Sequence, residues 1–165
     1  MDNNEKDAQI LPESLGCIEA DNEQYSFFLL KSEAYLFRRA DFIKREVEAR
    51  GFKIIETWKV RMKFSDIFKI YEGFAPRVAT TLRFPPLFEL DVCFVKNGVK
   101  RDVIDALCEL KREIRKELWG LSWLKGGFLH SPDCPEELRK HSQILEKRIV
   151  SSNRRSSFLP HRQIQ

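Results

Sequence analysis

The sequence has no long apolar run, no closely spaced cysteine pair and no internal repeat, and only three of its 165 residues are histidines. A helix that crosses a bilayer needs about 20 consecutive apolar residues, and no stretch of the chain approaches that length. The opening segment, MDNNEKDAQILPESLG, lacks the basic and apolar regions of a secretory signal. We therefore expect an intracellular, cytoplasmic protein that does not insert into membranes.

Cysteines are few and far apart, at positions 17, 93, 108 and 134. Zinc sites and redox-active disulfides use close pairs such as Cys-x-x-Cys, and no such pair occurs here. We expect reduced thiols, some of them buried as small apolar side chains. No metal site is predicted, because the pair His130 and His141 lacks a third ligand.

The composition, 42% hydrophobic and 33% charged, can support a core inside a well-solvated surface. The net charge of +4 is unevenly distributed: the first 24 residues carry seven acidic side chains and one lysine, and the last 19 carry five basic side chains and no acid. Such terminal segments are typically solvated. We predict an acidic flexible tail over 1–23, one domain over 24–150 and a basic flexible tail over 151–165.

Apolar periodicity predicts alternating strands and helices in the domain. Leu36, Ala40, Ile43 and Val47 form one helical stripe, which Gly51 ends. Strands are predicted at 25–31, 53–63, 88–95 and 127–130, and further helices at 65–74, 76–87 and 99–118 and from Asp133 onward, where Asp133 and Glu136 form a capping box. This order predicts an α+β fold, a ferredoxin-like antiparallel sheet with helices packed on it.

Each amphipathic element is expected to bury one side. Strand 88–95 alternates, with Phe88, Leu90, Val92 and Phe94 on one face. The helix at 99–118 places charged residues on its outer, solvated face.

Three segments together resemble nucleoside diphosphate kinase: FFLLKSEAYLFRRADFIKREVEARGFKI, FSDIFKIYEGFAPR and GGFLHSPDCPEELRKH. The resemblance covers roughly residues 24–148 and implies an antiparallel sheet with His130 at the position of the active-site histidine. In that family the histidine accepts the γ-phosphate of a nucleoside triphosphate and passes it to a diphosphate. By resemblance Lys31 contacts the phosphates, Tyr71 lines the pocket, and Arg77 has a structural role. Mg²⁺ accompanies the nucleotide if the protein is active.

The departures from the family fall on the partners of this histidine. Gly127 replaces an asparagine, Pro132 a serine, His141 the glutamate that orients the ring, and Ala106 a phosphate-binding arginine. The loop that supplies a second arginine and the trimer contacts is shortened. A neutral imidazole fixes another imidazole less well than a carboxylate does.

Three interpretations stay open. The favoured one is a catalytically weak or inactive pseudoenzyme that serves as a binding or scaffold module, in a ciliary, flagellar or cytoskeletal assembly, with a protein partner or as a homo-oligomer other than a hexamer. The second is an active kinase that works through phosphohistidine at His130. The third is a nucleic-acid-binding module, disfavoured because acidic residues alternate with its basic ones: Lys100, Arg101, Lys111, Arg112, Arg115 and Lys116.

Overall fold

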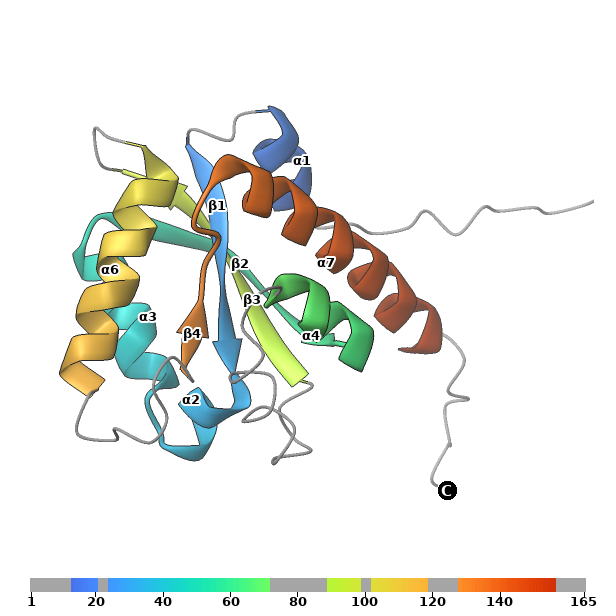
Figure 1. Ribbon diagram of the computed structural model, residues 1–165, viewed down its shortest axis with the longest axis horizontal. Helices are drawn as coiled ribbons and strands as arrows, with labels where there is room; N and C mark the ends of the chain where they lie inside the picture. Colours follow the sequence, from blue (N-terminus) through green and yellow to red (C-terminus); the bar gives the residue numbers. More distant parts are fainter. Residues whose placement is uncertain (1–12, 21–23, 72–88, 99–101, 119–127, 157–165) are drawn as a thin grey trace, which may run out of the picture.

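The computed structural model describes residues 13–20, 24–71, 89–98, 102–118 and 128–156, which Figure 1 shows in colour. Arg77, Gly127, the predicted helix at 76–87 and most of both predicted tails lie outside these residues. None of the helices in the described ranges is both long and apolar enough to cross a membrane.

The strands form one antiparallel sheet in the order β2-β3-β1-β4. β1 and β3 are central, and β2 and β4 are the two edges. This topology confirms the predicted ferredoxin-like α+β fold. The described elements, in chain order, are α1 (Glu13–Ala20), β1 (Tyr25–Lys31), α2 (Ser32–Leu36), α3 (Ala40–Ala49), β2 (Phe52–Arg61), α4 (Phe64–Ile70), β3 (Glu89–Asn97), α6 (Val103–Glu117), β4 (Leu129–His130) and α7 (Pro135–Ser156).

Helices cover both faces of the sheet. Figure 1 shows α3 and α6 on one side of the strands and α1, α4 and α7 on the other. α3 contacts α6, and α7 contacts both α1 and α4. The prediction that β3 buries only one face was therefore wrong, because every residue from Leu90 to Val95 is buried. Side chains on both faces of this central strand meet a helix layer.

The apolar run in β1 forms the centre of the core. Phe27, Phe28, Leu29 and Leu30 are fully buried. The ring of Phe27 packs edge-on against that of Phe94 in β3, with centroids 6.2 Å apart. Burying one such side chain stabilises the folded state by about 1.5–3 kcal/mol, so the position of β1 is strongly fixed, and with it the positions of residues paired with β1.

One predicted helix is two helices in the structure. Ala40, Ile43 and Val47 of α3 are buried as predicted, but Leu36 at the end of α2 is 69% exposed. Arg38 between them has a φ of 54°, in the left-handed region that non-glycine residues seldom adopt. This turn ends α2, changes the chain direction and takes Leu36 out of the apolar stripe.

Helical structure is present on both sides of the predicted domain limits. We expected residues 1–23 to be a flexible tail, but residues 13–20 form α1, which contacts β1 and α7. Leu15 and Ile18, three residues apart on α1, are buried. At the other end, α7 continues past the predicted boundary at 150 to Ser156. Residues 13–20 and 151–156 are therefore helical, and the first of these two segments packs against β1 and α7.

Gly98 is expected to tolerate no side chain. Its amide donates to the Gly51 carbonyl at 3.0 Å, and a Cβ on Gly98 would lie 2.5 Å from that carbonyl oxygen. Because the oxygen belongs to backbone, Gly98→Ala should lower the free energy of unfolding by about 1–3 kcal/mol, measured by urea titration. Gly16→Ala is the control: nothing lies within 4 Å of its Cβ position in α1, so it should leave stability unchanged or raise it. Equal stability of the two variants would contradict the prediction.

Candidate functional site

The short strand β4 places His130 beside the centre of the sheet. His130 pairs with Leu29 of β1, and the Lys31 amide donates to the Phe128 carbonyl at 3.1 Å. Lys31 therefore lies at the end of β1, next to the strand that carries His130. Both residues sit on strands whose positions the core determines.

Three side chains from other parts of the fold lie near His130. The ring centroids of His130 and Tyr71, at the end of α4, are 5.0 Å apart, and Lys31 Nζ lies 4.5 Å from the centroid of Tyr71. His141 of α7 lies on another side, with its centroid 5.3 Å from that of His130. The structure thus brings together Lys31, Tyr71 and His130, and it places His141 where the resemblance has an orienting glutamate.

Several buried polar atoms at this site have no hydrogen-bond partner within the described residues. They include His130 Nε2, Tyr71 Oη and His141 Nδ1. Buried polar groups in folded proteins are nearly always hydrogen-bonded. Three such atoms around one ring therefore mark a polar site inside an otherwise apolar layer.

Both histidines at the site are neutral at neutral pH. Burial holds the pKa of His130 well below its ordinary value, and nearby His141 and the charges of Lys31, Lys111 and Arg115 lower it further. Burial also lowers the pKa of His141. A neutral imidazole can act as a nucleophile, but here no carboxylate among the described residues accepts a hydrogen bond from it.

Comparisons with known proteins agree with this architecture. No model of a known protein family matches the chain, and no curated protein matches it. Among solved structures, the nucleoside diphosphate kinase of Aquifex aeolicus in an orthorhombic crystal form is 14% identical, with a TM-score of 0.53, over 73% of this chain and 93% of that one. The apo nucleoside diphosphate kinase of Encephalitozoon cuniculi is 15% identical, with a TM-score of 0.53, over 73% of this chain and 87% of that one. The chain has the nucleoside diphosphate kinase-like fold.

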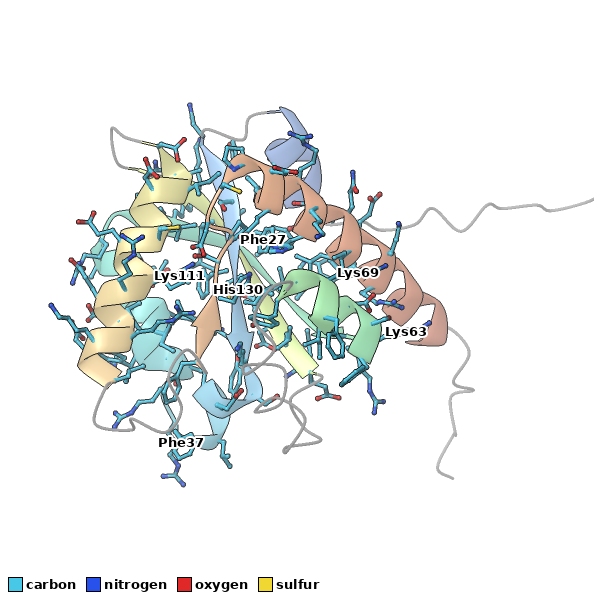
Figure 2. The ribbon with its side chains drawn as sticks, viewed as in Figure 1. Phe27, Phe37, Lys63, Lys69, Lys111 and His130 are labelled. Atoms are coloured by element: carbon cyan, nitrogen blue, oxygen red, sulfur yellow. The ribbon has the colours of Figure 1, made fainter. Side chains whose placement is uncertain are left out.

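In this nucleoside diphosphate kinase-like fold, two basic residues of α6 turn toward the histidine strand. Lys111 is only 4% exposed, and its Nζ donates to the Ser131 carbonyl at 3.0 Å. Arg115 Nη2 donates to the Leu129 carbonyl at 2.9 Å. Figure 2 shows Lys111 reaching from α6 toward β4, next to His130.

These contacts correct the prediction of a solvated basic face. Arg112 and Lys116 are exposed, but Lys111 is buried and Arg115 is half-buried. The burial of Lys111 could have been predicted from sequence spacing. Lys111 follows Leu107 by four residues and so lies on the buried stripe of α6. Two of the six basic residues that suggested nucleic-acid binding therefore face the protein interior.

Asp133 does not cap the last helix as predicted. Its carboxylate pairs with Lys111 and accepts the Cys108 thiol, with 3.1 Å between Cys108 Sγ and Asp133 Oδ1. Burial alone would raise the pKa of Asp133, but the hydrogen bonds from Lys111 and Cys108 and the charges of Lys111 and Arg115 together outweigh it, so the pKa is lowered. The Asp133 amide instead donates to Glu137, at 2.9 Å. The Asp133 carboxylate therefore binds Lys111 instead of capping the N-terminus of α7.

Ala106 stands where the resemblance has a phosphate-binding arginine. Ala106 is buried in α6, at 1% exposure. Within the described ranges, no group of three histidine, cysteine or carboxylate side chains could hold a metal ion.

Proposed function

We propose that this protein is a catalytically weak or inactive nucleoside diphosphate kinase-like module that binds partners rather than turning over nucleotides. The surroundings of His130 carry the proposal. An imidazole stands where a carboxylate would orient the ring, and the two nearby cations on α6 are bound to backbone carbonyls. The partner we propose is a protein or a second copy of this chain. The proposal includes a ciliary or cytoskeletal location, which the resemblance suggests.

Magnitudes favour impaired catalysis. Phosphoryl transfer relies on positioning and on cations that neutralise the spread-out charge of the transferred group, and one arginine can contribute about a thousandfold or more. A group that orients a catalytic histidine contributes about 10–100-fold. Loss of both kinds of support leaves His130 in place but slow. Lys31 remains as a cation whose position suits phosphate contact.

Slow phosphotransfer through His130 is the second candidate. The grouping of Lys31, Tyr71 and His130 supports it, because these three residues were predicted to share a nucleotide pocket and they lie together. The described residues offer no cluster that could hold a metal by itself, so Mg²⁺ would arrive bound to the nucleotide phosphates, whose charge it neutralises. Lys31 would then contact the phosphates, and Tyr71 would line the pocket.

Labelling with γ-labelled ATP and Mg²⁺ separates the two candidates. We expect acid-labile, alkali-stable label far below one phosphate per chain, and no transfer to a nucleoside diphosphate, while the Aquifex aeolicus enzyme labels fully in parallel. His130→Ala provides the background. Stoichiometric label that passes to a diphosphate and disappears in His130→Ala would overturn the proposal and establish the enzyme.

A further inference from the structure

β4 is an edge strand, so half of its backbone groups have no strand to pair with. The Phe128 carbonyl accepts the Lys31 amide, and His130 pairs with Leu29. Because backbone groups alternate in direction along a strand, the carbonyls of Leu129 and Ser131 point away from β1. These two carbonyls flank His130, and their partners decide how firmly the histidine is held.

α6 supplies a partner for each outer carbonyl. Arg115 donates to Leu129 and Lys111 to Ser131, at 2.9 Å and 3.0 Å. Carbonyls two residues apart on a strand are separated by about 6.6 Å, and residues four apart on a helix by about 6 Å along its axis. One helical turn therefore spans one strand repeat, and the two contacts can form together.

Lys111 also fixes the chain just after the histidine. Its Nζ pairs with Asp133, two residues beyond Ser131, so one buried ammonium group holds both the strand end and the following turn. Lysine is almost never this buried unless it is paired. The pair with Asp133 and the carbonyl of Ser131 satisfy that requirement.

We infer that Lys111 and Arg115 are positioning residues for His130, which they hold through the backbone on either side of it. This outer clamp is defined by the two hydrogen bonds to Ser131 and Leu129. The clamp holds the backbone on either side of His130, whereas a carboxylate would bind the imidazole ring itself. It also keeps two positive charges near the imidazole. The inference goes beyond the proposed function, because it holds whether or not the site binds nucleotide.

Clamp variants test the inference without any ligand. In Lys111→Met and in Arg115→Met, the pKa of His130 measured by NMR titration should rise, because a nearby cation is lost and the strand edge opens to water. Loss of a charge-assisted hydrogen bond should also speed hydrogen exchange of the Lys31 amide, which bonds to β4, by about tenfold or more. Arg112→Met removes an exposed cation from the same helix and should change neither quantity.

Lys111→Arg should restore the pKa and most of the protection, because arginine keeps the charge and can donate to both acceptors. Arg115→Met removes the hydrogen bond to the Leu129 carbonyl and keeps the pair between Lys111 and Asp133, so it carries the test if Lys111→Met fails to fold. An unchanged pKa and exchange rate in Arg115→Met would overturn the clamp. A pKa shift in Arg112→Met as large as that in Arg115→Met would also overturn it, because the effect would then be diffuse charge rather than contact.

Discussion

Replacing Asp66 by alanine is expected to lower the free energy of unfolding by about 3–5 kcal/mol, the cost of leaving one member of a buried ion pair alone. Asp66 is 5% exposed, and its Oδ1 accepts Arg148 Nη2 at 2.9 Å, while Oδ2 accepts Arg148 Nε and the Lys63 amide. The pair joins α4 to α7, and Tyr71 is the residue that caps the C-terminal end of α4. Urea denaturation monitored by circular dichroism measures the loss.

Two comparisons make this expectation specific. Arg50 and Glu113 form an exposed ion pair, and Arg50→Ala should cost less than about 1 kcal/mol. The double variant Asp66→Ala with Arg148→Met should recover part of the loss, because no charge is then left unpaired. If Asp66→Ala costs no more than Arg50→Ala, the pair does not hold α4.

The pH dependence of the same pair follows from its pKa. Burial alone would raise the pKa of Asp66, but the hydrogen bonds from Arg148 and the Lys63 amide and the charges of Arg148 and Lys69 together outweigh it, so the pKa lies below its ordinary value. A carboxyl with a lowered folded-state pKa stabilises the fold above the unfolded value of about 3.9, and this stabilisation is lost as pH falls through the folded-state pKa. Below about pH 4, the wild type and Asp66→Ala should therefore differ less in their free energy of unfolding.

Elements whose side chains repeat with one period were predicted well from sequence. The run at Tyr25–Lys31 and the stripe on Val103–Glu117 each describe contacts of one element with a common core. The break at Arg38 was missed, because the apolar spacing from Leu36 to Val47 continues through a left-handed turn that side-chain pattern does not reveal. The helix α1 was missed because acidic composition outweighed the spacing of two apolar residues.

The candidate site was predictable where side chains matched known motifs, and unpredictable where backbone was the partner. Lys31, Tyr71 and His130 were grouped by resemblance, and the structure places them together, while their roles stay predictions. The acceptor of Lys111 is the carbonyl of a residue 20 positions away. Any residue type could supply that carbonyl, so no sequence pattern marks it.

Replacing His141 by glutamate is expected to raise the rate at which ATP labels His130, by about tenfold or more over His141→Gln. The side chain of His141 is buried, and its ring centroid lies 5.3 Å from that of His130. His130 Nε2 has no partner within the described residues, so a carboxylate could accept a hydrogen bond there and fix the ring. The new carboxylate would also raise the pKa of His130. The positive charges of Lys31, Lys111 and Arg115, which act at His130, would favour the ionised form of this carboxylate.

His141→Gln is the matched control, because glutamine has the length of glutamate and can form hydrogen bonds but carries no charge. Both variants should fold, as judged by circular dichroism, and the added label should disappear in the double variant His130→Ala with His141→Glu. A gain that is confined to glutamate identifies the lost carboxylate as one cause of impaired catalysis. Equal labelling of the two folded variants would mean that orientation of the ring is not limiting and that the missing phosphate-binding cations are, since phosphoryl transfer depends on both.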